Sequence, residues 1–248
     1  MQPVRIGIGG WTFPPWRDNF YPKGLKQADE LAYAAARLGS IEINGTFYRT
    51  QSAASFRAWR DAAPEGFVFS VKASRPAAQR NDPDAAAPSI ERFLGSGLTE
   101  LGNGLGPILW QLPPTRRFDP ETMPRFLDQL PEARDGVTLR HALEAPHESF
   151  TSSEALALLR AHNVALVILD TEKSPAEPAE APLTADFVYV RMQRCIDEEP
   201  LGYSEAALDG WAGQLRSWSL QRPVFAYVIA GAKHRAPAAA MGLIARVG

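Results

Sequence analysis

The stretch EINGTFYR, residues 42–49, begins as a β-strand and ends in a run of polar side chains. Ile41 and Ile43 alternate with Glu42 and Asn44, so the two isoleucines share one face of the strand and the two polar residues share the other. Such a polar strand end is typical either of an ordinary sheet edge or of several strand ends that converge on a pocket. The other strands of the chain decide between these two interpretations.

Short apolar or β-branched runs recur along the chain and alternate with segments of helical periodicity. The apolar runs predict eight strands, at residues 5–11, 40–47, 67–73, 106–112, 137–145, 164–170, 187–193 and 223–231. The helical segments lie at residues 25–38, 52–63, 88–97, 119–130, 152–162, 204–218 and 236–247. Serine caps support two helix starts, at Ser152 or Ser153 and at Ser204.

Strands that alternate with helices predict a parallel sheet, and eight such units in 248 residues fit a single (β/α)8 barrel of the TIM type over residues 1–248. An open doubly wound sheet is the alternative. The near-constant spacing of the strands and the absence of a linker favour the barrel. One connection differs from the others, because residues 171–186 are rich in proline and lack an apolar period. They predict a loop in place of a regular helix between the sixth and seventh strands.

Composition and charge exclude several classes of protein. The net charge of −2 gives no global reason to expect binding to nucleic acid or to a membrane surface. Cys195 is the only cysteine, so an intrachain disulfide is excluded and a reducing compartment is indicated. The sequence shows neither a signal-peptide pattern nor a run of ~18 apolar residues. We therefore expect a cytoplasmic, monomeric protein with no membrane contact.

Most of the predicted strands carry a polar residue near the C-terminal end, where the active sites of such barrels lie. Strand parity places several of these side chains on the inward face. Each residue alone also fits a structural role, and it is their joint position that predicts a polar pocket. The candidates for substrate binding are Glu42, Asn44, Tyr48, Lys72, Gln111 and Arg191, and the candidates for catalysis are Glu144, His147 and Asp170.

Other motifs give weaker signals. GIGG, residues 7–10, lacks the spacing of a dinucleotide-binding loop. Carboxylates and imidazole suit divalent metals, but no metal-binding spacing is present, so we expect neither a metal nor another cofactor. Lys233, His234 and Arg235 follow the eighth strand and, with Arg194, form a candidate phosphate site. A solvated basic turn is the alternative interpretation of these four residues.

Six segments together resemble the YecE-like family, a group of TIM-barrel proteins classed as domain of unknown function 72. They are GIGGWTFPPWRDNFYPKGL (7–25), EINGTFYR (42–49), FVFSVKA (67–73), GPILWQLPP (106–114), LEAPHESF (143–150) and FVYVRM (187–192). The resemblance covers nearly the whole chain and implies a single (β/α)8 barrel without an established reaction. It also implies a polar pocket at the same nine candidate residues. A likeness in shape to metal-dependent sugar isomerases and endonuclease-like barrels implies sugar, phosphate or nucleic-acid ligands by analogy.

This chain departs from the pattern of the family at three strand ends. Pro146 precedes His147 where the family usually has arginine before histidine, and Gln193 begins a pair that is usually His-Gly. After the aromatic residue of the eighth strand, the chain has Val228 and Ile229 where the family usually has aspartate or asparagine. Three strands thus lack a polar or cationic group each.

The sequence leaves three functions open. The first is acid/base chemistry on a small phosphorylated or sugar-like substrate, with Glu144 and His147 as the proton-transfer pair. In that hypothesis Lys72 and Arg191 bind anionic groups, and Asn44 and Gln111 orient the substrate. The second is a binding protein without catalysis, for a nucleotide, a nucleic-acid end or a protein partner, which the three departures favour. The third is a divalent-metal hydrolase. A small anionic ligand is expected in the first two cases, and nucleic acid is the alternative.

Overall fold

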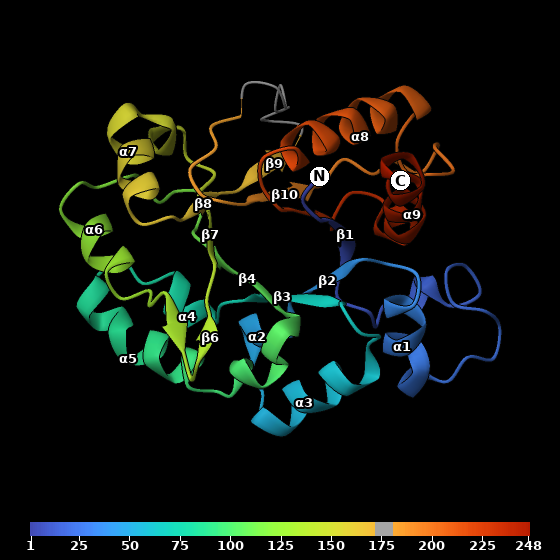
Figure 1. Cartoon of the computed structure of the whole chain (residues 1–248), viewed down its shortest axis with the longest axis horizontal. Coiled ribbons are helices and arrows are strands. Elements are labelled where there is room, and N and C mark those ends of the chain that lie inside the picture. Colours follow the sequence, from blue (N-terminus) through green and yellow to red (C-terminus); the bar gives the residue numbers. More distant parts are fainter. Residues whose placement is uncertain (172–180) are drawn as a thin grey trace.

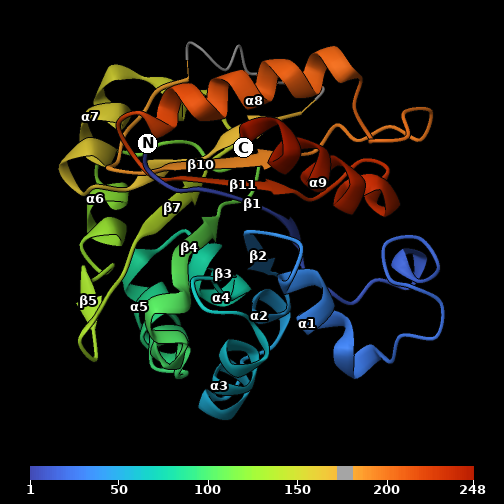
Figure 2. The ribbon, with the colours of Figure 1, turned by 45° about the vertical axis from the view of Figure 1, so that its right-hand side comes forward.

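The computed structural model of the chain describes residues 1–171 and 181–248. Within these residues, nine strands form one parallel sheet that curves into a barrel (Figure 1 and Figure 2). In their order around the sheet, the strands are β8 (Ala165–Leu166), β7 (His141–Glu144), β4 (Leu105–Gln111), β3 (Val68–Lys72), β2 (Ser40–Ile43), β1 (Val4–Gly9), β11 (Val224–Val228), β10 (Val188–Met192) and β9 (Ile168–Asp170).

The sheet closes through one continuous segment, residues 165–170. Its first half, β8, pairs with β7, and its second half, β9, pairs with β10 at the other end of the sheet. Between the halves, the main-chain N–H of Val167 donates a 2.9 Å hydrogen bond to the carbonyl of Leu143. Because β8 and β9 are halves of one strand, the nine strands make an eight-stranded barrel. This confirms the predicted (β/α)8 fold, and the open doubly wound alternative is wrong.

The helices lie around the outside of the barrel in the order of the sequence (Figure 1). They are α1 (Glu30–Ala35), α2 (Gly45–Tyr48), α3 (Ala53–Ala62), α4 (Arg75–Ala78), α5 (Pro83–Leu94), α6 (Thr122–Leu127), α7 (Ser153–Ala161), α8 (Glu205–Ser219) and α9 (Ala236–Val247). Ser152 Oγ and Ser204 Oγ accept hydrogen bonds of 3.3 Å from the main-chain N–H groups of Ala155 and Ala207. The serine caps predicted for α7 and α8 are therefore confirmed.

The second predicted strand is shorter than expected. It ends at Ile43, because Asn44 takes a helical backbone conformation (φ −93°, ψ −18°) and the next four residues form α2. The change from strand to helix turns the end of the EINGTFYR segment away from the direction of β2. The positions of Tyr48 and its neighbours therefore do not follow the parity of the strand.

The fifth predicted strand, residues 137–145, divides into two parts. Val137–Thr138 (β6) pairs with Ala133–Arg134 (β5) in an antiparallel hairpin, and only β7 joins the barrel. Asp135 and Gly136 form the turn, and both have positive φ angles, of 50° and 76°. An Asp-Gly pair is well suited to such a two-residue hairpin turn.

The predicted loop at residues 171–186, between the sixth and seventh barrel strands, falls largely outside the described residues, which omit 172–180. Residues 181–184 are described, and they lie in neither a helix nor a strand. The expected absence of a regular helix in this connection remains a prediction for the rest of the segment.

Strand parity divides the apolar side chains into two layers. The outward layer packs between the strands and the helices and includes Ile41 and Ile43, as predicted. The inward layer is a smaller cluster inside the barrel that includes Leu109, Phe187 and Phe225. The interior of the barrel is therefore a packed core and not a pore, as in other barrels of this type. The polar side chains at the C-terminal ends of the strands lie next to this inward apolar layer.

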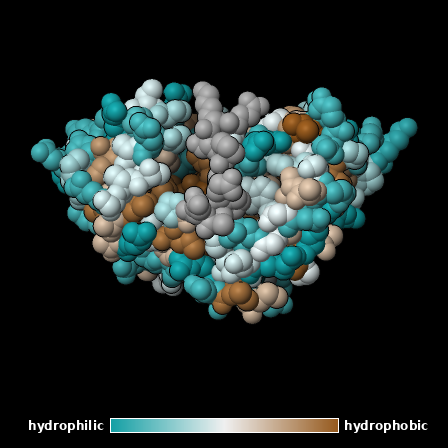
Figure 3. Space-filling view, turned by 90° about the horizontal axis from the view of Figure 1, so that it is seen from above, coloured by the Kyte–Doolittle hydropathy of each residue, from teal (hydrophilic) through white to brown (hydrophobic). Residues whose placement is uncertain are grey.

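Figure 3 shows one face of the surface, where hydrophilic residues cover most of the area and apolar residues lie in small separate patches. Across residues 1–171 and 181–248, the structure contains no helix with the length and apolar character needed to cross a bilayer. The expected cytoplasmic location and monomeric state remain predictions.

His141 on β7 is hydrogen-bonded to Trp110 on β4, in the outward layer between the strands and the helices. Its Nδ1 accepts a 3.1 Å hydrogen bond from the indole N–H of Trp110, and its Nε2 lies 2.8 Å from the carbonyl oxygen of Pro131. These partners require a neutral ring with its proton on Nε2. Burial favours the same state, because it lowers the pKa of His141 despite the hydrogen bond to Pro131.

Trp110→Phe is expected to lower the free energy of unfolding by about 1–3 kcal/mol, because it leaves the buried Nδ1 of His141 without its donor. Urea unfolding monitored by circular dichroism measures this change. Trp218→Phe is the control, since Trp218 is also buried and its indole N–H makes no hydrogen bond within the described part of the chain. Equal losses in the two variants would assign the effect to ring volume and not to the hydrogen bond.

Candidate active site

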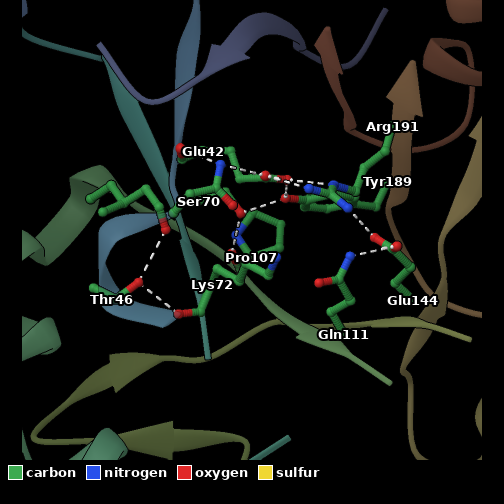
Figure 4. A network of polar contacts seen from close by, with 11 residues as sticks. Glu42, Thr46, Ser70, Lys72, Pro107, Gln111, Glu144, Tyr189 and Arg191 are labelled. Carbon is green, nitrogen blue, oxygen red and sulfur yellow. Dashed lines mark hydrogen bonds and ion pairs between the residues drawn. The ribbon is translucent and has the colours of Figure 1, made fainter. Parts of the chain in front are cut away.

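Five polar side chains meet inside the barrel at the C-terminal ends of its strands (Figure 4). All five belong to the predicted set, and four of them are less than 8% exposed. We call them the polar cluster: Glu42 on β2, Lys72 on β3, Gln111 on β4, Glu144 on β7 and Arg191 on β10. Parallel strands bring their carboxyl ends to one side of the barrel, so residues that are distant in sequence become neighbours there.

Arg191 is the centre of the polar cluster. Its Nε and Nη2 donate hydrogen bonds of 3.0 and 2.9 Å to the two carboxylate oxygens of Glu42, and its Nη1 donates to Oε2 of Glu144. The guanidinium therefore lies between the two carboxylates, as Figure 4 shows. Burial alone would lower the pKa of Arg191, but the charges of Glu42 and Glu144 outweigh it and raise the pKa.

Glu42 is completely buried, and each of its carboxylate oxygens accepts two hydrogen bonds. Oε1 accepts from Asn44 Nδ2 at 3.0 Å as well as from Arg191, and Oε2 accepts from Tyr189 Oη at 2.8 Å as well as from Arg191. Burial alone would raise the pKa of Glu42, but the charge and hydrogen bonds of Arg191 and the Tyr189 hydroxyl outweigh it and lower the pKa. Glu42 is thus an ionised anchor whose acceptor positions are filled.

Glu144 differs from Glu42 in how many hydrogen bonds it accepts. Its Oε1 accepts a 2.8 Å bond from Gln111 Nε2, and its Oε2 accepts one from Arg191. Each oxygen therefore has one donor within the described residues, although a carboxylate oxygen can accept two. Glu144 is the carboxylate of the polar cluster that retains acceptor positions for a substrate.

Lys72 is 7% exposed, and its ammonium group makes no ion pair within the described part of the chain. Nζ lies 4.3 Å from the centre of the Phe47 ring. Burial and the nearby charge of Arg191 lower the pKa of Lys72, against the opposing effect of Glu42 and Glu144. With two carboxylates and two cations, the polar cluster carries no net formal charge.

Two tyrosines and two serines lie inside the barrel next to the polar cluster, and none of the four is among the nine candidate residues. Tyr189 Oη lies 2.7 Å from Ser70 Oγ, and Tyr227 Oη lies 2.8 Å from Ser40 Oγ. Burial raises the pKa of both tyrosines, so both keep their hydroxyl protons. Tyr189 shares the parity of Arg191 on β10, which is the sequence signal that could have identified it.

The family model described as "Protein of unknown function DUF72" matches residues 5–248. The chain belongs to the DUF72 family. This confirms the resemblance seen in the sequence, which named the same domain of unknown function. No match to a curated protein was found.

Solved structures with the same fold include two other members of the DUF72 family. A family protein from Thermotoga maritima is 22% identical with a TM-score of 0.76, and the match covers 98% of this chain and 97% of that one. A second, from Enterococcus faecalis, is 17% identical with a TM-score of 0.76, over 98% and 94% of the two chains. A D-psicose 3-epimerase, solved in the presence of D-fructose, is 13% identical with a TM-score of 0.60, over 98% and 100%. At these identities, the likeness shows a shared fold.

Two predicted residues of the DUF72 protein lie away from the polar cluster because the chain turns before reaching them. Tyr48, at the end of α2, is 82% exposed, so its predicted place in the inward-facing pocket is wrong. His147 caps a short 3-10 turn, where its Nδ1 accepts a 3.1 Å hydrogen bond from the main-chain N–H of Ser149. The described residues contain no hydrogen bond between His147 and Glu144, and their expected role as a proton-transfer pair remains a prediction.

Asp170 is buried but faces the helices of the DUF72 protein and not the inside of its barrel. It has the parity of Ile168, which packs in the outward layer, and its Oδ2 accepts a 2.8 Å hydrogen bond from Tyr203 Oη. Arg194 Nη1 lies 3.6 Å from its other oxygen. Burial raises the pKa of Asp170, and the bonds from Tyr203 and Arg194 oppose that change. Asp170 therefore lies outside the polar cluster, and its predicted catalytic role remains a prediction.

The basic residues after β11, which were a candidate phosphate site, already contact the chain itself. Lys233 Nζ lies 4.6 Å from the centre of the Phe13 ring, and His234 Nε2 lies 2.9 Å from Asp197 Oδ1. Arg235 donates a 3.3 Å hydrogen bond to the carbonyl oxygen of Asp197. Binding of phosphate at this loop of the DUF72 protein remains a prediction.

The residues of the DUF72 protein that are described do not fit the divalent-metal alternative. Within residues 1–171 and 181–248, no group of three histidine, cysteine, aspartate or glutamate side chains could hold a metal ion. The guanidinium of Arg191 occupies the space between the carboxylates of Glu42 and Glu144. The guanidinium therefore occupies the position in which a metal ion shared by the two carboxylates would lie.

A separate surface cavity of about 540 Å³ lies between the connections that follow β3 and β4. Arg116 is part of its wall and donates a 2.6 Å hydrogen bond to Asn81 Oδ1. None of the five residues of the polar cluster lines this cavity. A substitution in this cavity can therefore test whether a ligand binds to the DUF72 protein at the polar cluster or elsewhere.

Proposed function

We propose that this DUF72 protein is an enzyme that transfers protons on a small sugar-like substrate at the C-terminal mouth of its barrel. The observation that carries the proposal is the difference between the two buried carboxylates. Glu42 has four hydrogen bonds, whereas Glu144 has two and keeps acceptor positions within a site from which most water is excluded. Glu144 is the proton-transfer group in this proposal.

The other residues of the polar cluster orient and tune Glu144. Gln111 fixes one carboxylate oxygen and Arg191 fixes the other, so the carboxylate presents a constant direction to the substrate. Arg191 has carboxylate partners for Nε, Nη1 and Nη2, which disfavours its predicted role as a binding group for a substrate anion. Lys72 is then the cation of the polar cluster that a substrate would meet.

The charge balance favours a neutral polyhydroxylated substrate over a phosphorylated one. Both carboxylates pair with Arg191, and the two carboxylates balance the formal charges of Arg191 and a protonated Lys72, so the polar cluster offers no excess positive charge to a phosphate group. Hydroxyl groups, in contrast, can both donate to Glu144 and accept from Lys72. The structural likeness to a D-psicose 3-epimerase solved with D-fructose agrees with a sugar-like ligand.

The proposed chemistry is the removal and return of a proton on the carbon next to a sugar carbonyl group. The Glu144 carboxylate accepts this proton, and the electrons of the C–H bond move toward the carbonyl group. Return of a proton to the opposite face of the same carbon completes an epimerisation. Return to the neighbouring carbonyl carbon, with net transfer of the hydroxyl proton between the two oxygens, completes an isomerisation. Positioned acid/base groups accelerate such steps by about 10²–10⁴-fold.

Exchange of carbon-bound hydrogen with solvent tests this proposal without knowledge of the product. The protein is incubated in D2O with D-fructose, other ketohexoses, aldoses and their phosphates, and deuterium in each sugar is measured by NMR. We expect protein-dependent deuterium incorporation next to the carbonyl group of at least one neutral sugar. Deuterium enters when the proton held by Glu144 exchanges with D2O before it returns to carbon, whether or not the sugar changes its configuration.

A ligand that binds at the polar cluster without exchange would overturn the proposal in favour of the binding-protein alternative. Thermal shift detects such binding, since a ligand at one hundred times its Kd adds about 2.7 kcal/mol of stability. Arg116→Ala serves as the control for binding in the separate cavity. Loss of the thermal shift in that variant would place the ligand there and would also count against the proposal.

A further inference from the structure

We propose that Lys72 forms a covalent imine with the carbonyl carbon of an aldehyde or ketone substrate. This inference deepens the proposed function, because it assigns the substrate class at the same site and names the group that activates it. It rests on the position of Nζ within the barrel, on the absence of an ion pair to it among the described residues, and on the engagement of both nearby carboxylates by Arg191.

The main chain holds Lys72 firmly in place at the end of β3. Thr46 Oγ1 lies 2.6 Å from the carbonyl oxygen of Lys72 and 3.0 Å from that of Ile43, so one hydroxyl ties the start of α2 to two neighbouring strands (Figure 4). This tie brings Phe47 of α2 over the amine, with Nζ 4.3 Å from the ring centre. The main chain at Lys72 is thus held in place, and its Nζ lies beside the Phe47 ring.

The carboxylates of the polar cluster bind Arg191 in preference to Lys72. Glu42 receives two of its four hydrogen bonds from the guanidinium, and Glu144 receives one of its two from the same group. A lysine in a tight ion pair would stay protonated and could not attack a carbonyl group. Lys72 instead lies in a buried site beside another cation, and these are the two conditions that activate lysines as nucleophiles.

The direction of the pKa shift agrees with this geometry. Burial first and the charge of Arg191 second lower the pKa of Lys72, while Glu42 and Glu144 oppose them. A lower pKa means that more of the amine is neutral at a given pH than in an exposed lysine.

Each step of the proposed reaction balances. The lone pair of neutral Nζ forms a bond to the carbonyl carbon as the C=O π bond breaks, and one proton passes from Nζ to the oxygen to give a neutral carbinolamine. The hydroxyl group then leaves as water with a proton from solvent, the nitrogen lone pair forms the C=N bond of a protonated imine, and no oxidant or reductant is needed. The positive nitrogen then draws electrons from the neighbouring C–H bond as Glu144 accepts the proton. Return of the proton and addition of water reverse the sequence and release the sugar.

A structural role is the competing interpretation, in which Lys72 only balances the charge of the two carboxylates. The two roles differ in what an arginine would do at this position. Lys72→Arg keeps the positive charge and should preserve the folded state if charge balance is the role. An arginine does not form the imine, so proton exchange on the substrate should be lost in that variant.

Reductive trapping tests the imine directly. The protein is incubated with glyceraldehyde or D-fructose and sodium cyanoborohydride, which transfers hydride to the protonated imine and fixes it as a secondary amine. Peptide mass spectrometry then gives the rate of modification at each lysine over a range of pH. Lys23 and Lys26 are exposed controls, and Lys233 is a half-buried control that stacks on Phe13 outside the polar cluster.

At neutral pH we expect Lys72 to be modified faster than Lys23 and Lys26, because its lowered pKa leaves more of the amine neutral. We also expect the rate at Lys72 to level off at a lower pH than the rates at the exposed lysines. Modification of Lys72 at or below the rate of the exposed lysines would overturn the inference. Faster modification of Lys233 than of Lys72 would also overturn it, because burial alone would then account for the reactivity.

The deuterium experiment separates failure of this inference from failure of the proposed function. If folded Lys72→Arg protein still exchanges hydrogen on the sugar, the imine is overturned and proton transfer by Glu144 remains. If Lys72 is trapped selectively but no sugar exchanges hydrogen, the proposed proton transfer by Glu144 is overturned, and the inference that Lys72 forms an imine remains.

Discussion

Arg191→Met is expected to lower the free energy of unfolding by about 3–5 kcal/mol, because removal of one partner from a buried ion pair leaves the others uncompensated. The variant keeps a side chain of similar length but leaves the carboxylates of Glu42 and Glu144 without the guanidinium that contacts both. Lys72 is then the nearest remaining cation, and it makes no ion pair with either carboxylate in the described structure. Urea unfolding at pH 7, with the slope held fixed between variants, measures the loss.

The pH dependence of Arg191→Met should be opposite to that of the natural protein. In the natural protein, the pKa of Glu42 in the folded state is below its ordinary value of 4.5, because Arg191 outweighs the effect of burial. The stabilising contribution of Glu42 is then full above that value and is lost as the pH falls through the folded-state pKa. Without the guanidinium, burial should hold the pKa of Glu42 above its ordinary value. The difference in stability between the two proteins should therefore shrink as the pH falls from about 7 to about 5.

Arg57→Met is the matched control for this prediction. Arg57 forms an ion pair with Glu100 at 2.7 Å, but both side chains are more than one-third exposed. Solvent screens such a pair, so its loss should cost at most about 1 kcal/mol. If Arg191→Met cost no more than this control, water would have to replace the guanidinium, and the central role of Arg191 in the polar cluster would be contradicted.

Glu144→Gln is expected to slow proton exchange on the substrate by about 10²–10⁴-fold, since the amide cannot accept the proton. The substitution keeps the size of the side chain and one oxygen that can accept from Gln111 or Arg191. The fold should therefore persist, although the polar cluster gains one net positive charge. Deuterium incorporation into the responsive sugar measures the rate, and the melting temperature shows whether the variant is folded.

Glu148→Gln is the matched control, because Glu148 lies nearby on the exposed turn after β7. It removes one negative charge from the same end of the barrel without touching the polar cluster. Exchange at the natural rate in folded Glu144→Gln would remove Glu144 from the mechanism. Equal slowing in both variants would point to the overall charge of this face and not to the carboxylate as a proton acceptor.

Much of the polar cluster could be predicted from the sequence because strand parity is a local property. Glu42 alternates with two isoleucines, and Arg191 is two residues from the inward-facing Tyr189, so their faces follow from a few neighbouring residues. The segment that closes the barrel shows that a position at the end of a strand does not by itself place a side chain in the pocket. Its position at the end of a strand predicts Asp170 in the pocket, yet Val167 and Leu169 take the inward face there and Asp170 takes the other.

The remaining errors come from changes of backbone geometry within a segment. Asn44 leaves the strand conformation, so the period of two residues that holds through Ile43 does not reach Tyr48. Asp135-Gly136 was a readable hairpin signal inside what was predicted as the start of a long strand. Which carboxylate has its acceptor positions filled could not be predicted, because the donors to Glu42 come from β10 and from the turn after β2, segments far apart in sequence.

The barrel is expected to open first at the closing segment, residues 165–170. Two register pairs join it to β7 and three join it to β10, whereas β1 and β11 share five. Each half of the segment has a strand partner on one side only, and the two register pairs at the seam between β8 and β7 are fewer than those at any other joint of the barrel. Local opening in proteins begins where such contacts are fewest. Parting the seam would convert the barrel into a sheet with two free edges, while the strand ends that carry Glu42, Lys72 and Gln111 stay paired with their neighbours.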